Sequence, residues 1–480
     1  MSVASLLFLG FGLAVAAVYN ISRNLSWRQW VLLIANTAFL CTFSTSLISW
    51  LPYITFLTLG YIGYLLIRNR VPGSLALFLS SILLAFIWLK KYSFLPDNSF
   101  LHFPYVTLGL SYVLFRILHL LLDVSAETIT EFITPISFLN YTLNFTAIIS
   151  GPIQRFQDYS VMQLSDDVQP LTIIDIGHAL ERIVIGYFKI SVAGFVLQSL
   201  QQYYIGSVDV LGAAPLAQRV IAGAIIIAAY PLFLFCNFSG YTDMVIGVAR
   251  WIRLTLPENF NRPFSATNFL DFWNRWHITL SSWLKTYVYT PLLLQLMRWY
   301  QNRELAPYLG VLSFFVTFFL VGVWHGRTSV FVAFGLLQGG GVSLNKLYQI
   351  LMTRYLGRIE YKALSAMGWY RATCRGLTFT FFAFSLIWFW SNWVQMGHIL
   401  HALKPTAVFI GLCAVFIIAT LWLTAYEWAH NQLFSWEING TQVFTSRYLR
   451  VAYCTVMVVV QSVVLNVMSM PTPQIVYKAF

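Results

Sequence analysis

The sequence predicts an all-α, polytopic integral membrane protein. Of its 480 residues, 58% are hydrophobic and 10% are charged, whereas an ordinary soluble domain carries about 25% charged residues. The mean hydropathy is +0.70. A helix needs about 20 apolar residues to cross a bilayer, and uncharged runs of that order recur along the chain. We therefore expect about 11 membrane-spanning helices and exclude a soluble fold.

The net charge and the cysteines indicate which partners and cross-links to expect. The net charge is +12, but charged residues are so few that this excess indicates basic loops on the cytoplasmic side of a membrane rather than a nucleic-acid partner. The five cysteines lie in apolar runs, and no CxxC motif occurs. We therefore expect neither disulfides nor a metal site.

The N-terminal quarter is expected to supply four spans. The first uncharged run, residues 1–22, is followed rather than preceded by a basic residue, Arg23, which favours a retained helix with an outer N-terminus over a signal peptide. Residues 29–67 carry no charge and are long enough for two helices, with Pro52 marking the turn. Residues 71–89 form the next run.

The remaining runs complete the expected set of helices. The longer ones are residues 220–242, 305–326, 376–397, 405–426 and 451–477, and shorter or interrupted ones are 101–115, 132–154, 183–208 and 328–344. No internal repeat is present, which weakens the interpretation as an inverted-repeat transporter. No linker rich in Gly or Ser divides the chain, so we expect a single membrane domain over residues 1–480.

The interval 240–304 differs from the rest because it is rich in charges and aromatic residues and contains LPENFNRPF. Such a segment cannot cross the bilayer as one straight helix. Charged, irregular backbone is tolerated at membrane depth only when it is buried in protein or lines a watery cavity. The basic loops 68–70, 90–91 and 354–375 all favour the cytoplasm, which strict alternation of straight spans cannot satisfy. We therefore expect re-entrant segments and a central cavity.

Two histidines are candidates for chemistry. His277 belongs to FWNRWHITLSSWL (272–284). In a helix, Asp271 and Arg275 would pair at i,i+4, and His277 would face the other side. There it would share a surface with Trp273, Leu280, Ser281 and Leu284. The alternative is a structural histidine that donates a hydrogen bond to a backbone carbonyl.

The second histidine, His325, lies at the end of a long uncharged run, within the sequence VGVWHG (321–326). Its glycine neighbours, Gly322 and Gly326, permit close approach of another backbone or a ligand. A neutral imidazole there is a candidate general base, and a buried, hydrogen-bonded structural histidine is the alternative. No HExxH, Cys/His cluster, GxSxG or Walker motif occurs. The glycines of QGGGVS (338–343) favour tight helix packing over phosphate binding.

Four segments in this order resemble the membrane-bound O-acyltransferase (MBOAT) family. They are FSGYTDMVIGVAR (238–250), LPENFNRPF (256–264), FWNRWHITLSSWL (272–284) and VGVWHG (321–326). The resemblance covers about residues 105–395 and is nearest to bacterial members of the alginate O-acetyltransferase and teichoic-acid D-alanyl transfer types.

The resemblance implies a ring of helices around a thinned centre, with a central tunnel between the two membrane faces. It implies that His325 is catalytic and that His277 lines the tunnel. Trp324, Trp276, Ser281 and Asn274 are candidates to line the tunnel or support an oxyanion. The family passes an acyl group from a cytoplasmic thioester to a hydroxyl, in bacteria usually of an envelope polymer, often with a periplasmic or envelope partner. The expected location is the bacterial cytoplasmic (inner) membrane.

The chemistry of the residues agrees with that expectation. Acyl transfer to a hydroxyl needs a base, for which His325 is suited, and a donor to the oxyanion, for which His277 or the Trp324 indole is suited. We expect Arg262, Arg275 and Lys285 to attract the phosphates of coenzyme A or an acidic acyl-carrier protein. The donor, acetyl-coenzyme A or an acylated carrier protein, is a substrate, and no bound cofactor is expected.

Two departures from the family pattern leave the substrate open. Gln338 stands where many bacterial relatives carry a histidine, and residues 289–304 lack the glycine-rich loop of the alginate type. The leading hypothesis is an O-acetyltransferase acting on an extracellular or envelope polysaccharide. The alternatives are D-alanyl transfer from a carrier protein to a wall polymer, a transporter or flippase, and a scaffold subunit of a synthase complex.

Overall fold

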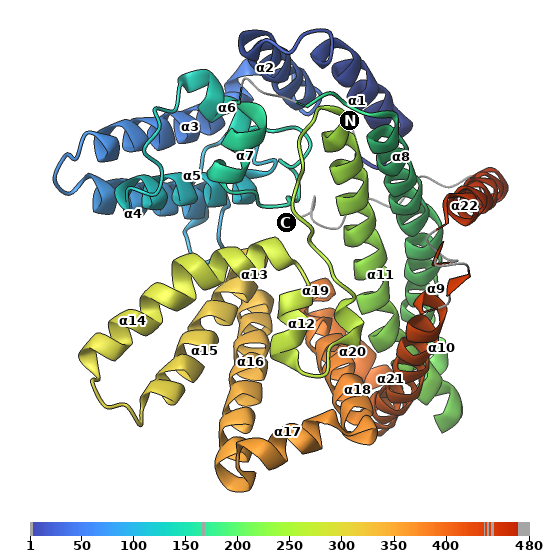
Figure 1. Cartoon of the computed structure of the whole chain (residues 1–480). Coiled ribbons are helices and arrows are strands. Elements are labelled where there is room, and N and C mark those ends of the chain that lie inside the picture. Colours follow the sequence, from blue (N-terminus) through green and yellow to red (C-terminus); the bar gives the residue numbers. More distant parts are fainter. Residues whose placement is uncertain (1–2, 166–168, 436, 439–440, 443–445, 469–480) are drawn as a thin grey trace. The chain divides into compact units, whose positions relative to one another are not determined.

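The computed structural model (Figure 1) describes residues 3–165, 169–435, 437–438, 441–442 and 446–468. Every element among them is a helix except a two-residue hairpin, in which Glu437–Ile438 pairs with Thr441–Gln442. The prediction of an all-α, polytopic membrane protein is therefore confirmed. The chain divides into two compact units, which are described separately below.

Eight described helices are long and apolar enough to cross a membrane. They are α3 (Leu47–Arg68), α8 with α9 (Ile173–Gly206), α11 (Leu216–Trp251), α15 (Ala306–His325), α16 (Ser329–Leu356), α18 (Gly368–Ser385) with α19 (Ile387–Trp390), α21 (Pro405–Phe434) and α22 (Arg447–Met468). Two shorter apolar helices are α1 (Leu6–Tyr19) and α4 (Ser74–Leu89). The described chain thus holds fewer candidate spans than the expected number of about 11.

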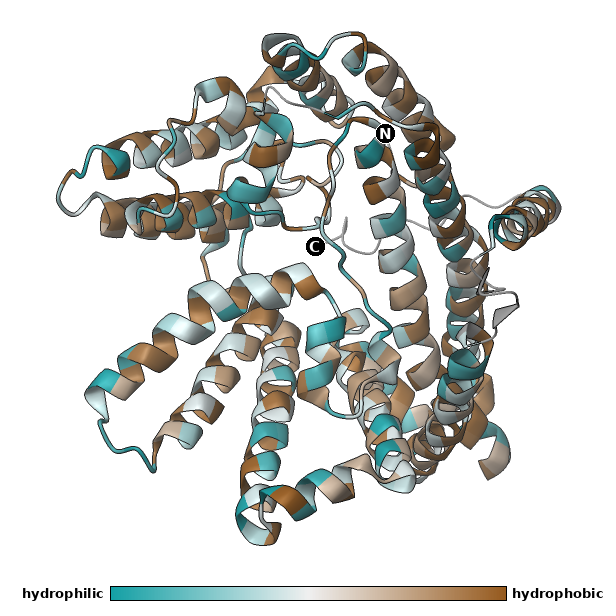
Figure 2. Ribbon diagram, viewed as in Figure 1, coloured by the Kyte–Doolittle hydropathy of each residue, from teal (hydrophilic) through white to brown (hydrophobic). Residues whose placement is uncertain are grey.

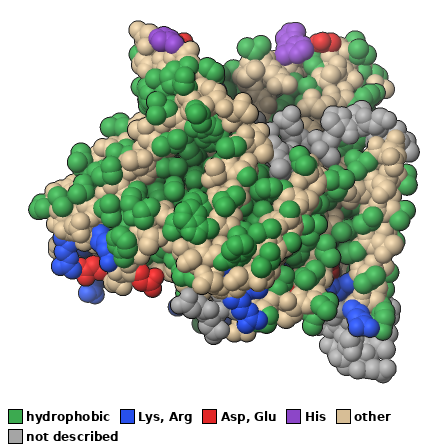
Figure 3. Space-filling model, turned by 90° about the horizontal axis from the view of Figure 1, so that it is seen from above, with side chains coloured by type: hydrophobic (Ala, Val, Ile, Leu, Met, Phe, Trp, Pro, Cys, Tyr) green, Lys and Arg blue, Asp and Glu red, His purple; other side chains and the backbone are tan. Residues whose placement is uncertain are grey.

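Hydrophobic residues are concentrated in the candidate membrane helices. Figure 2 shows hydrophobic residues along most of α3 and α4, whereas α12 (Phe269–Arg275) carries both hydrophobic and hydrophilic residues. The face seen in Figure 3 is covered mainly by hydrophobic side chains, with charged side chains towards its margins. Such a surface is suited to contact with lipid, where polar groups have no water to bind.

The first unit takes in the described residues up to 190 and residues 238–258. Besides α1, α3, α4 and the last turns of α11, its helices are α2 (Leu25–Cys41), the 3-10 turn η1 (Asp97–Ser99), α5 (Leu110–Ser125), α6 (Pro135–Thr142), α7 (Phe156–Gln163) and α8 (Ile173–Phe188). Helix α5 is buried over most of its length, so it forms the core of this unit.

Two of the expected spans in this unit are wrong. Helix α5 begins only at Leu110, so the run 101–115 is mostly not helical. In the run 132–154 only α6 is helical, and the chain after it is irregular but buried. The guanidinium of Arg116 explains that burial, because it donates to carbonyl oxygens that no helix satisfies. Its acceptors are Tyr141 O (3.0 Å), Thr142 O (2.9 Å) and Ala147 O (3.2 Å).

The expected turn at Pro52 is also wrong, because Pro52 lies inside α3. The chain instead turns over residues 42–46, between α2 and α3. That stretch reads TFSTS, and its hydroxyl side chains favour turns because they bond to the local backbone. Thr42 Oγ1 donates to Phe39 O at 2.8 Å. A proline is tolerated within a membrane helix, where neighbouring groups re-satisfy the freed carbonyl.

The second unit takes in residues 191–237 and the described residues from 259 onwards. Its further helices are α9 (Phe195–Gly206), α10 (Val208–Gly212), α12, α13 (Ile278–Leu284), α14 (Thr290–Trp299), α17 (Arg358–Ala366) and α20 (Trp393–Leu403), with a 3-10 turn at Pro263–Ser265 and a π-helical turn at Lys285–Tyr289. The expected loop 354–375 is thus mostly helical, and the expected span 376–397 is broken between α19 and α20.

Glycines bring α15 and α16 into close contact. A Cβ atom added to Gly322 would lie 2.1 Å from the Cα of Gly335, and one added to Gly339 would lie 2.7 Å from the Phe315 carbonyl oxygen. Neither distance is compatible with a side chain. The sequence-based interpretation of QGGGVS as a packing segment is therefore confirmed at Gly339, since small residues let membrane helices approach each other closely.

Candidate active site

His277 lies between two short helices rather than inside one long helix. Helix α12 (Phe269–Arg275) ends two residues before it, and α13 (Ile278–Leu284) begins directly after it. The backbone of His277 has a φ of 46°, in the left-handed region that L-residues adopt at a cost. The prediction of a continuous helix is wrong at this residue. The expected i,i+4 pair of Asp271 with Arg275 is confirmed, at 3.0 Å.

The left-handed turn results from backbone pairing with the segment LPENFNRPF. The pairs are Asn261 N with Arg275 O (2.9 Å), Ile278 N with Asn259 O (3.0 Å) and an isolated bridge between Phe260 and Trp276. A helix continuing through His277 could not make these bonds, because its N–H groups would be used within the helix. Two motifs that are separate in the sequence thus form one structural frame.

The Asn259 side chain fixes the protonation of the His277 ring. Its Oδ1 accepts from the backbone N–H of Thr279 (3.2 Å) and from the Thr279 hydroxyl (2.7 Å), and lies 3.2 Å from His277 Nδ1. A backbone N–H only donates, so the Asn259 atom must be the oxygen. Nδ1 of His277 therefore carries the proton, and the lone pair lies on Nε2.

Burial keeps this ring neutral. His277 is 1% exposed and Asn259 is fully buried. His277 lies outside the candidate membrane spans, and its burial lowers its pKa to about 3, because the charged form loses its hydration. Nε2 can thus accept a hydrogen bond near neutral pH. The expected role as oxyanion donor would require the opposite tautomer.

His325 is the last residue of α15 and is also buried, at 4% exposure. Its ring centroid lies 4.7 Å from that of Trp324, 5.1 Å from that of Phe389 and 6.1 Å from that of Phe334. Gly326 follows it, and a Cβ atom there would lie 2.0 Å from the Phe331 ring. The histidine therefore sits at the end of a span, enclosed by aromatic rings on a closely packed backbone.

One helical segment, α18 with α19, contacts the surroundings of both histidines. Phe382 packs against Trp276, with ring centroids 5.1 Å apart, and Phe389 packs against His325. Between them, Ser385 Oγ accepts from Gln338 Nε2 at 2.8 Å. The segments that carry His277 and His325 thus lie against the same wall, within the second unit.

The other residues predicted to line the tunnel differ in how deeply they are buried. Trp276 is 2% exposed and lies among Phe235, Phe260 and Phe272, so it packs the frame around His277. Ser281 is half-buried, and its hydroxyl donates to Trp276 O at 3.4 Å. Trp324 is half-buried, and Asn274 is exposed.

The three cationic side chains expected to bind the acyl donor differ in whether a carboxylate pairs with them. Arg262 forms an ion pair with Glu427, and Glu427 also accepts from the Ser265 hydroxyl. Arg275 is held by Asp271, as described above. Lys285 is exposed at the start of the π-helical turn, and no ion pair of its side chain occurs among the described residues.

Two contributors were not predicted as site residues. Asn259 had no signal beyond its place in LPENFNRPF. Arg375, expected in a basic loop, is buried in α18, where it donates to Thr424 Oγ1 at 3.0 Å and to Ser265 O at 3.4 Å. Ser265 also donates to Glu427. The guanidinium groups of Arg262 and Arg375 therefore both lie near the Glu427 carboxylate.

The remaining groups do not form a second site of this kind. His119 is buried in α5, its Nε2 accepts from Phe156 N at 2.9 Å, and its Nδ1 lies 3.4 Å from Asp123. His398 pairs with Asp209 at the surface. Over the described ranges, no group of three or more His, Cys, Asp or Glu side chains is arranged to hold a metal ion.

Comparison with known proteins now bears on this geometry. The family model for membrane-bound O-acyltransferases, MBOAT, matches residues 29–369, a stretch that contains both histidines and begins earlier than the expected boundary near residue 105. Three relatives are described below, and two of them are of the types expected from the motifs.

The relatives cover different parts of this chain. A teichoic acid D-alanyltransferase of Bacillus subtilis (strain 168) is 29% identical over 284 residues, covering 58% of this chain and 67% of that protein. A peptidoglycan O-acetyltransferase of Helicobacter pylori (strain ATCC 700392 / 26695) is 32% identical over 222 residues, or 46% and 39%. A probable alginate O-acetylase of Azotobacter vinelandii is 26% identical over 254 residues, or 51% and 45%.

This chain therefore spans about two thirds of the first relative and less than half of each of the other two. The family match, in contrast, extends over most of the chain and includes α12 and α13, which flank His277, and α15, which carries His325. The chain belongs to the membrane-bound O-acyltransferase family, and the acyl transfer expected from its sequence is the activity of that family.

Proposed function

We propose that this protein transfers an acyl group from a thioester donor on the cytoplasmic side of a membrane to a hydroxyl group of a cell-envelope glycan. The observation that carries the proposal is the position of His325, buried among aromatic rings at the end of a candidate span. An imidazole in such surroundings can take a proton from a hydroxyl while water is largely excluded.

The chemistry assigned to His325 is general-base catalysis. As its ring removes the proton of the acceptor hydroxyl, the hydroxyl oxygen attacks the carbonyl carbon of the thioester. The tetrahedral intermediate then collapses, the carbon–sulfur bond breaks, and the proton passes to the departing thiolate. The Trp324 indole N–H is the donor that we assign to the intermediate's oxyanion.

His277 has a different role in this proposal. Because Asn259 fixes its proton on Nδ1, Nε2 presents a lone pair and no proton. We assign to it the acceptance of a hydrogen bond from the incoming hydroxyl, which would orient that group towards the thioester. Lys285, exposed and without an ion pair in the described chain, is assigned to the phosphates of coenzyme A or to an acidic carrier protein.

The leading candidate for the acyl group is acetyl, and for the acceptor an envelope or extracellular polysaccharide. The names of the Helicobacter and Azotobacter relatives support O-acetylation. D-alanyl transfer from a carrier protein is the second candidate, because the Bacillus relative, of which this chain covers 67%, is a teichoic acid D-alanyltransferase. For either reaction we propose a bacterial cytoplasmic membrane as the location and an envelope protein as the partner.

A donor assay on the purified full chain in nanodiscs tests the proposal. We would supply radiolabelled acetyl-coenzyme A and, separately, D-alanyl-loaded carrier protein, and follow thioester consumption and label transfer to a glycan acceptor. The variants are His325→Ala and His277→Ala. His398→Ala is the matched control, because His398 belongs to the same unit but pairs with Asp209 at the surface.

Loss of general-base catalysis typically costs about 10²- to 10⁴-fold in rate. We expect such a loss in His325→Ala, a smaller loss in His277→Ala and an unchanged rate in His398→Ala. Turnover that persists in a folded His325→Ala protein would refute the catalytic assignment. The donor that supports turnover decides between the acetyl and the D-alanyl candidates.

A further inference from the structure

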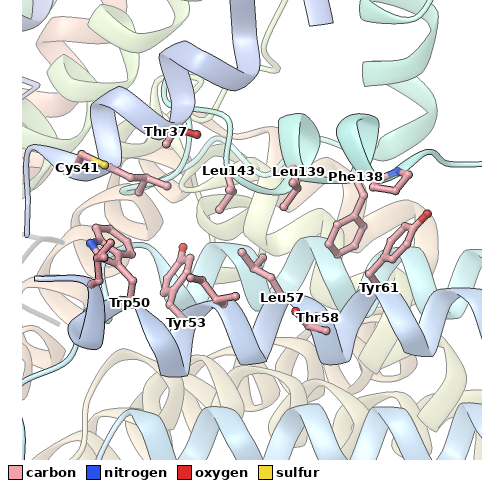
Figure 4. A pocket seen from close by; sticks show the side chains of 14 residues that line it. Thr37, Cys41, Trp50, Tyr53, Leu57, Thr58, Tyr61, Phe138, Leu139 and Leu143 are labelled. Atoms are coloured by element: carbon pink, nitrogen blue, oxygen red, sulfur yellow. The ribbon is translucent and has the colours of Figure 1, made fainter. Parts of the chain in front are cut away.

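Each of the two units contains a pocket of a size typical of small-molecule sites, roughly 300 to 1,000 Å³. The pocket of the first unit, about 500 Å³ between α2, α3 and α6 (Figure 4), is lined by uncharged and mostly apolar described residues, so its wall does not identify an occupant. The pocket of the second unit, about 510 Å³, lies where α15 begins, α16 ends and α17 follows. Its wall carries Glu304, Lys346 and Arg354. We call it the charged pocket, because these three side chains can identify a ligand.

The charged pocket exists because α16 extends beyond the start of α15. The Ser343 hydroxyl donates to Val311 O at 2.9 Å, which places these two residues at the same level of the helix pair. From that level α15 extends back only five residues to Ala306, whereas α16 continues for thirteen residues to Leu356. At about 1.5 Å per residue, α16 therefore projects roughly 12 Å past the start of α15. The charged pocket lies against this projecting segment.

The side chains around the charged pocket change as they do across the boundary of a membrane. Helices α15 and α16 are both candidate spans. Towards their centres the exposed side chains are apolar, as at Leu312 and Leu344. On the projecting segment Tyr348 and Tyr355 are exposed, and beyond it Arg358 is exposed. Acyl chains, headgroups and water favour apolar, aromatic and basic side chains in this same order. The pocket therefore lies at the level of lipid headgroups.

Two cationic side chains of the charged pocket are available to a phosphate group. Lys346 is half-buried and Arg354 is exposed, and neither forms an ion pair within the described chain. The Arg354 guanidinium donates to Tyr308 Oη at 3.3 Å, which leaves its further N–H groups for a ligand. Helix α15 begins at the same pocket without a side-chain cap, so its N-terminus adds partial positive charge. Together these groups suit a phosphate.

The carboxylate of Glu304 decides which phosphate compound fits. Glu304 is exposed on the wall of the same pocket, and no ion pair joins it to either cation among the described residues. A carboxylate repels a ligand that carries only negative charge and attracts one that also carries a cation. The phosphoethanolamine headgroup carries one phosphate and one ammonium group. The phosphoglycerol headgroup carries the phosphate alone.

We propose that the charged pocket binds the headgroup of a phosphatidylethanolamine molecule, with its phosphate between Lys346 and Arg354 and its ammonium group at Glu304. The acyl chains of the lipid extend into the bilayer along the exposed apolar side chains of α15 and α16. Pro307 lines the pocket, and His325 is the last residue of the same helix, eighteen residues or roughly 27 Å away. The lipid site is therefore separate from the candidate active site, and the proposal does not depend on acyl transfer.

Three lipids with identical acyl chains test the assigned charges. We would delipidate the full-length protein in detergent and measure dissociation constants by native mass spectrometry. The lipids are phosphatidylethanolamine, phosphatidylglycerol and N-acetyl-phosphatidylethanolamine, which keeps the phosphate but has lost the ammonium charge. Phosphatidylethanolamine should bind about 2- to 5-fold more tightly than either of the others, the effect of one exposed ion pair. Equal dissociation constants for the three lipids would overturn the proposal.

Two variants separate the carboxylate from the phosphate site. Glu304→Gln should weaken binding of phosphatidylethanolamine to the level of its N-acetyl derivative, whereas Lys346→Gln should weaken binding of all three lipids by about 2- to 5-fold. The matched controls are Glu360→Gln and Lys362→Gln, which change exposed residues of α17 outside the pocket wall and should leave binding unchanged. If the controls weaken binding as much as the pocket variants do, the lipid is held by general surface charge and the assigned site is wrong.

Soluble competitors distinguish a lipid from other phosphate compounds. Phosphoethanolamine and coenzyme A should not displace bound phosphatidylethanolamine at equal concentration, because neither offers the apolar contacts of the acyl chains. Displacement by phosphoethanolamine would show that the pocket takes the free headgroup compound. Displacement by coenzyme A would assign the pocket to the acyl donor. Either result would refute a lipid as the occupant.

Discussion

The side-chain oxygen of Asn259 lies 3.2 Å from Nδ1 of His277, and the same oxygen accepts two hydrogen bonds from Thr279. This single atom decides which ring nitrogen carries the proton. Partners that orient an imidazole in this way typically change activity by about 10- to 100-fold when they are removed, by analogy with metal-bound histidines. The first prediction follows from this relationship.

Replacing Asn259 by Asp should change the pH dependence of acyl transfer. In the wild-type protein the pKa of His277 is lowered to about 3 by burial, so the ring stays neutral across the physiological range and does not cause any loss of rate on mild acidification. A carboxylate at position 259 would favour the protonated imidazolium and raise that pKa. The rate of the variant should therefore fall more steeply than that of the wild type as the pH is lowered towards about 5.

The measurement is kcat/KM as a function of pH for both proteins. Asn274→Asp introduces the same charge at an exposed position of α12 and should keep the wild-type profile. An Asn259→Asp profile identical to that of the wild type would contradict the assigned control of His277.

The adjacent glycines Gly339 and Gly340 should respond oppositely to alanine. A Cβ atom at position 339 would lie 2.7 Å from the Phe315 carbonyl oxygen, whereas nothing lies within 4 Å at position 340. Gly339→Ala should lower the free energy of unfolding by about 1 to 3 kcal/mol through overpacking. Gly340→Ala should be neutral or raise it by up to about 1 kcal/mol, because alanine favours the helix. Thermal unfolding in detergent distinguishes the two, and equal shifts in Tm would disprove the packing of α15 against α16.

The bond between Gln338 and Ser385 should couple α16 to α18. Ser385 donates its own proton to Phe382 O at 2.8 Å, so it can only accept from Gln338. Ser385→Ala leaves the buried Gln338 amide without its acceptor and should cost about 1 to 3 kcal/mol of stability. In a double-mutant cycle with Gln338→Leu, we expect a coupling energy of about 0.5 to 3 kcal/mol. Strictly additive effects of the two changes would show that this bond does not contribute.

Lys285 should matter for donor binding more than the two paired arginines. Lys285→Gln removes an exposed charge and should raise the KM for the thioester donor by about 2- to 5-fold, the effect of a solvent-exposed ion pair, with kcat nearly unchanged. The effect should shrink at high salt because ions screen exposed charges. Lys362→Gln, an equal change at an exposed site on α17, is the control. An unchanged KM in Lys285→Gln would exclude this residue from the donor site.

The membrane helices could be predicted where hydropathy alone decides the outcome. The run 71–89 became Ser74–Leu89, and the run 305–326 became Ala306–His325, because a lipid-exposed segment must be apolar and must satisfy its backbone internally. The same reasoning failed at residues 132–154. Their apolar character reflects burial in the protein core around Arg116 rather than contact with lipid.

The site was only partly predictable for a related reason. His325 stands at the end of an uncharged run, so its burial could be inferred from local sequence. The conformation of His277 could not, because it depends on backbone bonds to Asn259, eighteen residues earlier in the chain. The ion pair of Arg262 with Glu427 joins residues even farther apart, and neither residue type indicates its partner. The ring of helices and the tunnel implied by the family resemblance stay predictions.

The backbone frame that joins LPENFNRPF to FWNRWH also has a consequence for how this scaffold can diverge. The position of the imidazole depends on main-chain bonds and on one asparagine, so exposed side chains of α12 and α13, such as Asn274, can change without displacing it. Substitutions there leave in place the main-chain bonds that hold the imidazole, so the geometry of the ring is inherited unchanged. Variation at the surface and preservation of the buried frame are thus separated within a stretch of fewer than thirty residues.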